Sequence, residues 1–289
     1  MTIDLRGART FIEANARVLD QRVARCLFDG DDPATVADAV TAYRNADGGF
    51  GHGLEPDKRA PGSQPLDVEI AFEALAAVGA PALDLVASAC DYLDTVADAD
   101  GAVPIAFPEI ADHPHAVHWN EIPLEPALNP TASILAYALA LGTEHRWVTR
   151  ATEWCFRTLE QDGPPDEVHA LRCVAWFLDA APDRDRAQAL GPSVGAALPG
   201  ANLYQAEPDP DEYGVGPLEF APTPASLARA WFDDAQIERH LDHLEHEQRP
   251  DGGWPIAWEP PSDASRCDWR GMVTIHALRT LRAYGRLPD

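Results

Sequence analysis

One loop motif recurs along the chain and constrains the fold more than any other feature. Its two strong copies are Asn45-Ala-Asp-Gly-Gly-Phe50 and Gln248-Arg-Pro-Asp-Gly-Gly-Trp254, and weaker copies end at Gly101 and Gly163. Glycine pairs permit the φ > 0 turn that joins antiparallel helices, and the preceding Asp can bond the amides of the turn. These loops are therefore predicted to be structural turns between helices.

The spacing of the loops indicates a repeated helix pair. Gly48, Gly101, Gly163 and Gly252 are separated by 53, 62 and 89 residues, and the last interval fits two repeats. A period of about 45–60 residues with two helices in each repeat is typical of helical arrays. Helices are expected over 8–28, 33–44, 65–78, 81–97, 130–142, 145–160, 165–180, 183–197, 223–232, 235–248 and 265–284. Because each pair buries one face only against its neighbours, the prediction is an all-α protein whose pairs close into an α/α barrel, as a single domain over residues 1–289.

Composition excludes several classes of function. The net charge of −25, from 47 acidic and 22 basic residues, would repel a phosphate backbone, so no nucleic-acid partner is expected. No apolar run approaches the roughly 18 residues of a membrane span, and the N-terminus lacks the apolar core of a secretory signal. We therefore expect a cytoplasmic protein without an integral membrane segment, and nothing in the sequence specifies an oligomeric state. Five widely spaced cysteines without a CxxC pair predict reduced, mostly buried thiols.

The segment from Gln248 to Trp254 resembles the QW repeat of squalene-hopene cyclases and their relatives. In that repeat a glutamine ends an outer helix, glycines turn the chain and an aromatic ring packs on the turn. The segment from Asn45 to Phe50 looks like a second copy, with Asn for Gln and Phe for Trp. The stretches 63–75 and 268–281 look like the inner helices that follow such loops. On these residues the chain resembles the α/α toroid family of terpenoid cyclases and protein prenyltransferases.

The resemblance implies an enzyme that acts on an isoprenoid or other apolar small molecule, in a central barrel cavity, by acid–base or carbocation chemistry. It implies no cofactor, except magnesium if the substrate is a diphosphate. Asp29-Gly-Asp-Asp32 has the letters of the DxDD acid motif of class II terpene cyclases, yet only one helix separates it from the next glycine loop. These carboxylates are therefore expected to be exposed at the start of an outer helix. No metal site is expected, because Arg270 stands where the zinc-binding cysteine of the prenyltransferases would follow Asp268.

Three loop segments, 52–57, 113–120 and 254–270, are predicted to form the functional site. Each precedes an expected inner helix, and the loops that enter parallel inner helices gather at one end of a barrel. Carboxylates and an imidazole can supply acid–base chemistry, and the catalytic candidates are Asp268, Glu55, Asp57 and His118. Aromatic rings stabilise cations, and the substrate-binding candidates are His52, Trp119, Trp254, Trp258, Trp269 and Arg270.

Structural roles compete with these interpretations. Asp57 could pair with Lys58 or Arg59, and Asp268 could cap the last helix and pair with Arg266 or Arg270. Two other functions also stay open: a non-catalytic binding or scaffold domain, and a carbohydrate-active α/α barrel that uses carboxylates such as Glu55 and Asp268. A deep apolar cavity with one buried carboxylate favours the isoprenoid enzyme and a filled centre favours the scaffold. An open polar groove with carboxylates about 5–10 Å apart favours the carbohydrate enzyme.

Overall fold

The computed structural model describes residues 3–210 and 212–287, which form α-helices, short 3-10 helices and no β-sheet. The α-helices of this described part are α1 (Leu5–Asn15), α2 (Val18–Asp29), α3 (Ala34–Thr41), α4 (Pro65–Val78), α5 (Leu83–Val96), α6 (Leu128–Ala140), α7 (Arg146–Gln161), α8 (Val168–Ala180), α9 (Arg184–Ala197), α10 (Pro217–Phe220), α11 (Asp234–His246) and α12 (Asp263–Ala283). The 3-10 helices are η1 (Pro108–Asp112), η2 (Val117–Asn120), η3 (Leu198–Gly200) and η4 (Leu227–Trp231). The predicted all-helical class is confirmed for these residues.

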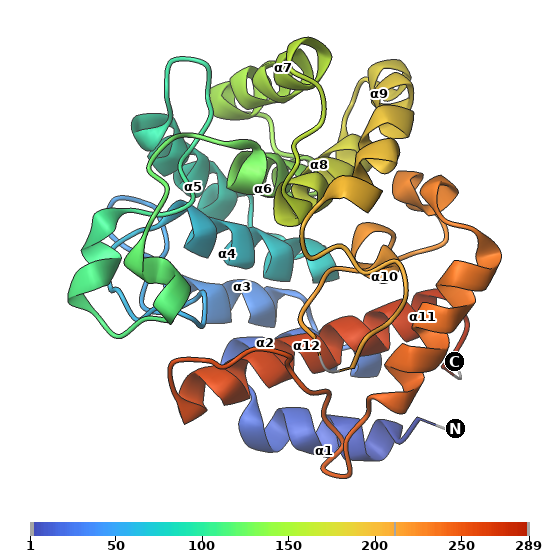
Figure 1. The fold of residues 1–289 in the computed structure, drawn as a ribbon. Helices are drawn as coiled ribbons and strands as arrows, with labels where there is room; N and C mark the ends of the chain where they lie inside the picture. The colour runs from blue at the N-terminus through green and yellow to red at the C-terminus, as the bar shows by residue number, and fades with distance from the viewer. Residues whose placement is uncertain (1–2, 211, 288–289) are drawn as a thin grey trace.

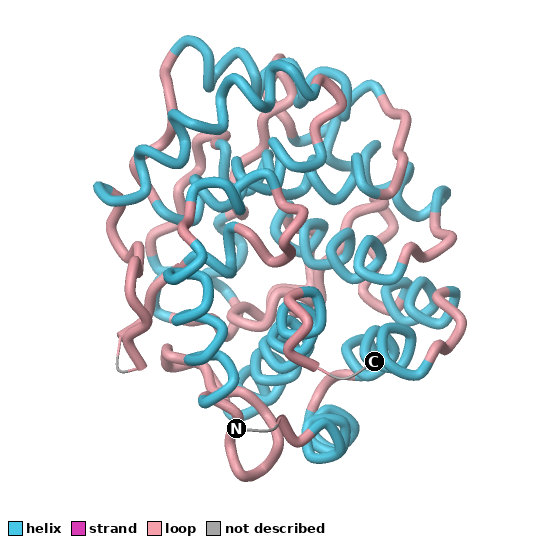
Figure 2. The backbone as a smooth tube through the Cα atoms, turned by 90° about the vertical axis from the view of Figure 1, so that its right-hand side faces the viewer, coloured by secondary structure: helices cyan, strands magenta, loops and turns pink. Residues whose placement is uncertain are grey.

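Every second helix packs against the next in one row. α2 packs on α4, α4 on α6, α6 on α8 and α8 on α10, while α3, α5, α7 and α9 lie outside this row. α12 contacts α1, α2 and α11, so elements from the two ends of the chain lie side by side (Figure 1). The side view in Figure 2 shows the helices joined by loops of varied length, with no strand among the described residues. Closure of the row into a barrel stays a prediction.

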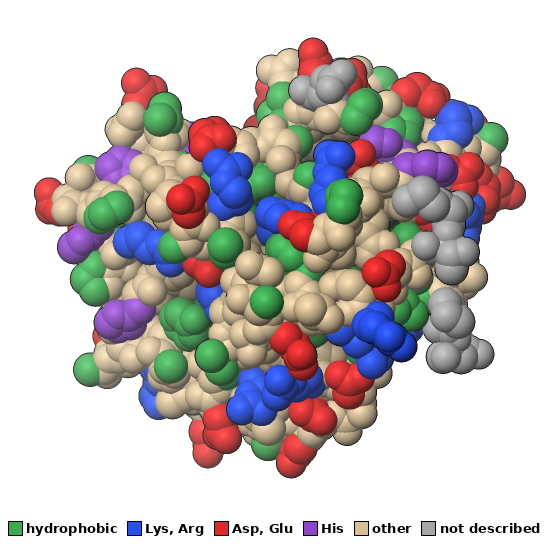
Figure 3. Space-filling view, turned by 90° about the horizontal axis from the view of Figure 1, so that it is seen from below, with side chains coloured by type: hydrophobic (Ala, Val, Ile, Leu, Met, Phe, Trp, Pro, Cys, Tyr) green, Lys and Arg blue, Asp and Glu red, His purple; other side chains and the backbone are tan. Residues whose placement is uncertain are grey.

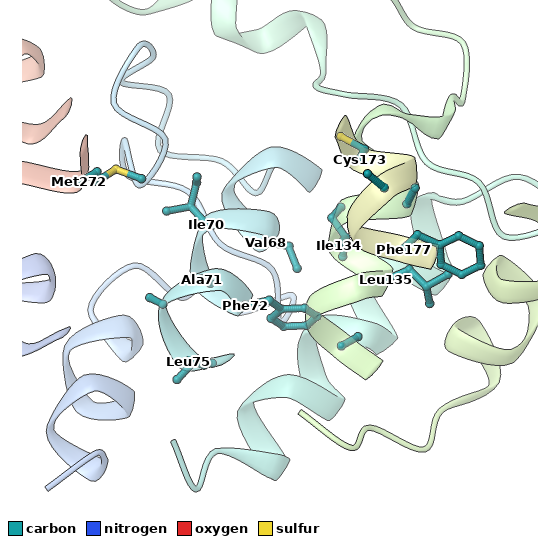
Figure 4. Packing of buried hydrophobic residues seen from close by; sticks show 14 of the residues in the cluster. Val68, Ile70, Ala71, Phe72, Leu75, Ile134, Leu135, Cys173, Phe177 and Met272 are labelled. Carbon is teal, nitrogen blue, oxygen red and sulfur yellow. The ribbon is translucent and has the colours of Figure 1, made fainter. Parts of the chain in front are cut away.

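The core lies between α4, α6 and α8. Val68 and Phe72 of α4 face Ile134 of α6, and Phe177 of α8 packs behind them (Figure 4). All four side chains are fully buried. Full burial of an aliphatic or aromatic side chain contributes about 1.5–3 kcal/mol. This block therefore fixes the relative positions of three helices that carry polar side chains on their other faces.

The predicted helix over 8–28 is wrong, because the chain breaks between α1 and α2. Ala16 and Arg17 adopt extended conformations, with ψ of 160° and 156°. The break lets the Arg17 guanidinium bond the carboxylate of Asp20 at 2.7 Å and the carbonyl of Leu54 at 2.6 Å. It also lets Ala16 lie against Gly271 of α12, where a Cβ would approach the Ala16 side chain to 2.6 Å. The contacts with Leu54 and Gly271 are tertiary. The sequence around the break contains no glycine or proline, so the break could not be predicted from local residues.

The predicted helix over 223–232 is also wrong. The structure instead has the short helix α10, an irregular turn and the 3-10 helix η4. Pro222 and Pro224 lack N–H donors and disfavour helical geometry in the residues before them. The hydroxyl of Ser226 lies 3.4 Å from the amide of Thr223, which closes the turn.

The surface is acidic and mixed. Figure 3 shows acidic side chains scattered over one face and interspersed with Lys and Arg. Asp29, Asp31 and Asp32 are exposed beside the start of α3, and Asp32 accepts the amide of Ala34 at 2.9 Å. The expectation that these carboxylates lie outside the centre is confirmed. Across the described ranges, no helix has the length and apolar character that crossing a membrane requires.

Candidate functional site

The turn that follows the first glycine loop is buried and highly charged. Residues 54–58 carry Glu55, Asp57 and Lys58, of which no side chain exposes more than about 5 % of its surface. Lys58 forms an ion pair with Asp67 in the first turn of α4. The other carboxylate oxygen of Asp67 accepts the amide of Glu55 at 2.7 Å. Lys58 is thereby occupied by Asp67, so the alternative in which it pairs with Asp57 is wrong.

Asp57 is the point at which the three predicted loop segments meet. Its Oδ1 accepts the indole N–H of Trp269 at 2.8 Å and lies 3.3 Å from the hydroxyl of Ser265. Its Oδ2 lies 3.9 Å from Nε2 of His118. Its backbone carbonyl accepts the amide of Ala116 at 2.7 Å. Residues 52–57, 113–120 and 254–270 therefore converge in space, as the sequence predicted.

The environment of Asp57 raises the pKa of its carboxyl. Burial raises the pKa of this carboxyl, and the hydrogen bond from Trp269 together with the nearby His118 imidazole offsets only part of that effect. Both donors to the side chain act on Oδ1, which leaves Oδ2 as the atom that can hold a proton. A protonated Oδ2 in this position can act as a general acid.

Asp268 lies one residue from Trp269 on α12 but points to a different partner. Its carboxylate pairs with the guanidinium of Arg59 at 2.9 Å, and Ser262 caps the helix. Burial raises the pKa of Asp268, and the positive charges of Arg17 and Arg59 oppose this. The expected alternative, in which Asp268 caps α12 and pairs with Arg266 or Arg270, is therefore wrong.

Glu55 is buried without a full set of partners. Its Oε2 accepts no hydrogen bond and lies 3.9 Å from Nζ of Lys58. Burial raises the pKa of Glu55 to about 8, against the opposing charge of Lys58. The Glu55 side chain is buried, and its raised pKa makes the free energy of folding depend on pH.

The aromatic candidates separate into two groups. Trp269 meets Trp258 edge to face at 5.2 Å between ring centroids, and Trp258 meets Tyr213 in the same way at 5.5 Å. Trp119 is buried and packs against the ring of His118 at 5.0 Å. These rings form an aromatic edge beside Asp57. Trp254 instead lies in the core, where its N–H bonds the carbonyl of Leu244 at 2.8 Å.

Two further predicted residues are engaged elsewhere. His52 has a φ of 59° and its Nε2 lies 2.9 Å from the amide oxygen of Asn45, so it braces the first glycine loop. Arg270 forms two bonds of 2.8 Å with Asp251 and lies over the ring of Phe11. It braces the second glycine loop in the same manner. Within the described residues, neither side chain forms a hydrogen bond or ion pair with Asp57 or Asp268.

The structure adds a polar cluster that the sequence interpretation missed. Glu73 of α4 pairs with His276 of α12 at 2.8 Å, although these two helices belong to opposite ends of the chain. Glu69 of α4 is buried, and burial raises its pKa to about 7 against the charge of Arg172 of α8. We call these four side chains, together with Tyr137 of α6, the interior cluster.

A helical spacing could have revealed the interior cluster. Glu69 and Glu73 lie four residues apart on a helix that is otherwise almost wholly apolar. Arg172 likewise lies on α8, another mostly apolar helix. Residues four apart on a helix share one face. Buried polar side chains on such a face are costly unless they are hydrogen-bonded or paired, so this spacing indicates a polar cluster.

Two other possibilities for the site lack support in the described residues. Nowhere in 3–210 and 212–287 do three His, Cys, Asp or Glu side chains gather as a metal ion would require. A groove of about 590 Å³ between α9 and η4 is lined by small and apolar residues with Trp231 at its edge. That groove contains no titratable side chain among its lining residues, whereas the surroundings of Asp57 and the interior cluster do.

Comparison with known proteins gives one curated similarity of sequence. No family model matches the chain. It is 28 % identical over 292 aligned positions to a drimenyl diphosphate synthase of Streptantibioticus cattleyicolor. The alignment covers 89 % of this chain and 49 % of the relative, so the chain spans about half the length of that enzyme. The protein is thus a helical protein distantly related to an isoprenoid-processing enzyme.

A solved structure supports the fold alone. A crystal structure of a protein from Actinoplanes superposes with a TM-score of 0.50 at 15 % identity. The match covers 96 % of this chain and 88 % of the other. At this identity the likeness extends to the helical architecture and carries nothing about activity.

These findings correct the resemblance drawn from the glycine loops. No family model, that of the terpenoid cyclases and prenyltransferases included, matches the chain, and the similarity found is to a drimenyl diphosphate synthase. An alignment of the two loops also shows why they were weak evidence for the QW repeat. When Gly48 is aligned with Gly252, Gln248 falls opposite Arg44, so Asn45 does not replace the glutamine of the repeat.

Proposed function

We propose that this chain is an enzyme that acts on an isoprenoid substrate, with Asp57 as its general acid. The observation that carries the proposal is the Asp57 carboxyl. Two donors hold its Oδ1, burial favours its protonated form, and tryptophan rings stand beside it. An acid of this kind can protonate an alkene, and neighbouring aromatic faces stabilise the resulting cation by about 0.5–2 kcal/mol per ring.

The proposal places the substrate between the aromatic edge and the interior cluster, in the space that α4, α6, α8 and α12 would enclose as a barrel. Arg172 is the proposed partner of an anionic group such as a diphosphate. Its guanidinium lies over the ring of Trp176 at 4.9 Å, and its Nε has no hydrogen-bond partner. Arg270, by contrast, is bonded to the carboxylate of Asp251, so Arg172 is the better suited of the two to a ligand.

The test is turnover of linear prenyl diphosphates by the purified chain. Geranyl, farnesyl and geranylgeranyl diphosphate are supplied with and without magnesium, and products are separated by mass. We expect Asp57→Asn to lose about 10²–10⁴-fold in rate, the usual contribution of a general acid. The variant keeps an acceptor at Oδ1, so its unfolding transition should match that of the wild type.

The matched control is Asp47→Asn, which changes a loop carboxylate that bonds Gly49 and Ser63. It should retain turnover. Arg172→Gln should raise KM for the diphosphates more than it lowers kcat. Equal rates in Asp57→Asn and wild type would refute the assignment of Asp57 as the acid. Turnover of oligosaccharides but not of prenyl diphosphates would show that the substrate is a carbohydrate.

A further inference from the structure

A second set of proton-carrying groups lies on the other side of the aromatic edge from Asp57. Tyr213, in the loop before α10, places its hydroxyl 2.8 Å from Nε2 of His169 on α8. The other ring nitrogen of His169 is bonded to Glu167. The three side chains form a continuous hydrogen-bonded row of phenol, imidazole and carboxylate.

The direction of these hydrogen bonds is fixed by chemistry. Glu167 accepts the backbone amides of His169 and Ala170 at 2.9 and 2.8 Å. Burial raises the pKa of its carboxyl, but the hydrogen bond to the His169 side chain and these two amides hold it low, at about 2. An ionised carboxylate only accepts hydrogen bonds, so Nδ1 of His169 donates to Glu167. In the neutral imidazole, Nε2 then accepts the hydroxyl proton of Tyr213.

The row is held rigidly on both sides. Glu167 is the N-terminal cap of α8. The loop that carries Tyr213 is pinned by backbone bonds between Gln205 and Val215 at 3.1 Å and between Val215 and Leu203 at 2.8 Å. The phenol thus faces Trp258 in a fixed position, and Trp258 in turn meets Trp269, the donor to Asp57.

We infer that Tyr213, relayed by His169 and Glu167, is the general base that ends the reaction begun by Asp57. This inference rests on the proposed function and names the group that completes it. Tyr213 is the catalytic residue, because it would touch the reacting atoms. His169 and Glu167 act through it.

The proton balance is complete. Asp57 donates the proton on Oδ2 to one carbon of a substrate alkene, and the other carbon becomes cationic. A C–H bond next to a later cationic carbon then breaks, its electron pair forms a new C=C bond, and its proton passes to the Tyr213 oxygen. The hydroxyl proton of Tyr213 moves to Nε2 of His169, and Glu167 stabilises the imidazolium. The His169 imidazolium then releases its proton to solvent and solvent returns a proton to Asp57, so the substrate is isomerised with no other reactant. His169 and Glu167 expose 25 % and 50 % of their side chains, which permits this exchange.

The experiment compares product partition among variants. Tyr213→Phe keeps the ring and removes only the hydroxyl, and His169→Gln removes the proton acceptor. We expect both to change which products are formed from prenyl diphosphate, because the cation that Asp57 generates then lacks its base. The ratio of olefinic to hydroxylated product should fall at least about tenfold, because water then captures the cation. Glu167→Gln, which keeps the cap acceptor, should show a smaller shift in the same direction.

The matched control is Tyr204→Phe, in the same loop, whose hydroxyl accepts a hydrogen bond from Gln236 at 3.4 Å. A product ratio in Tyr213→Phe equal to that of the wild type, with Asp57→Asn inactive, would overturn the relay and leave the proposed function intact. Equal shifts in Tyr204→Phe and Tyr213→Phe would also overturn it, since the loop as a whole would then be responsible. Absence of turnover by the wild-type chain would remove both proposals.

Discussion

The two strong glycine loops adopt the same turn and serve different parts of the molecule. In the first, Gly48 has a φ of 92° and the amide of Gly49 is bonded to Asp47 at 3.0 Å. In the second, Gly252 has a φ of 94° and the amide of Gly253 is bonded to Asp251 at 3.1 Å. The local sequence is thus sufficient to set the local geometry.

The surroundings of the two loops differ. Gln248 of the second loop bonds the backbone of Asp4 through both ends of its amide, at 2.8 and 3.0 Å, so this loop joins the two ends of the chain. The first loop leads directly into the buried turn that carries Glu55 and Asp57. A repeated motif therefore provides a scaffold, and the segment after it decides whether a site forms there.

The largest expected effect is on stability at the second loop. A Cβ at Gly252 would lie 2.2 Å from backbone atoms of Gly7, which cannot yield as a side chain would. Gly252→Ala should cost roughly 3–5 kcal/mol, from the positive φ together with overpacking. A Cβ at Gly48 would lie 2.5 Å from the backbone oxygen of Ser88, a less severe approach than 2.2 Å, so Gly48→Ala should cost somewhat less. Urea denaturation gives both values.

Gly30→Ala is the control for this pair, because its φ is 78° and no atom lies within 4 Å of the added Cβ. It should cost only about 1–2 kcal/mol, from the backbone conformation alone. If Gly252→Ala were no less stable than Gly30→Ala, the close packing of the second loop on α1 would not contribute to stability.

The next prediction concerns the pH dependence of stability, which should arise in the segment after the first loop and not in the segment after the second. The pKa of Glu55 is raised from 4.5 to about 8 in the folded protein, so folding favours its protonated form. Stability from this group is full below about pH 4.5 and falls as the pH rises through 8. The free energy of unfolding should drop by roughly 2–4 kcal/mol across that range. Glu69 contributes in the same direction.

Glu55→Gln should remove much of this decline when unfolding is measured at pH 5 and at pH 8.5. Glu259→Gln, after the second loop, changes an exposed side chain that pairs with Arg266 and should leave the decline unchanged. An undiminished decline in Glu55→Gln would show that another buried group controls the pH dependence.

A smaller effect distinguishes two tryptophans of the same segment. Trp254→Phe removes the donor to the buried carbonyl of Leu244 and should cost about 1–3 kcal/mol without altering turnover. Trp269→Phe removes the donor to Asp57 and should lower turnover with little change in stability. Thermal unfolding and steady-state rates of the two variants provide the measurement. The reverse pattern would place the site at Trp254.

The smallest effect concerns the loop carboxylates. Asp47→Asn and Asp251→Asn should each destabilise the protein by about 1 kcal/mol, because each weakens one bond to a glycine amide. Asp251→Asn should cost slightly more, since the second partner of Asp251 is the charged guanidinium of Arg270, whereas that of Asp47 is the neutral hydroxyl of Ser63. A difference of several kcal/mol between the two would mean that the loops are not equivalent turns.

Much of the site could be predicted by topology alone. The expectation that 52–57, 113–120 and 254–270 meet required only that each segment precede an inner helix, and Asp57, His118 and Trp269 do meet. The partners within the site were harder to predict. Asp268 selects Arg59, which is 209 residues away, over Arg266 and Arg270 on its own helix. Sequence distance favours the local pair, but side-chain direction on α12 excludes it.

The sequence by itself determined the helical class, the positions of the turns and the exposure of Asp29, Asp31 and Asp32. These follow from glycine conformation, capping and apolar spacing, which act over a few residues. Only the tertiary structure decided the break at Ala16, the pairing of Lys58 with Asp67 and the row from Glu167 to Tyr213. Each of these depends on which helix faces are brought together, since a buried polar group takes the partner that packing supplies.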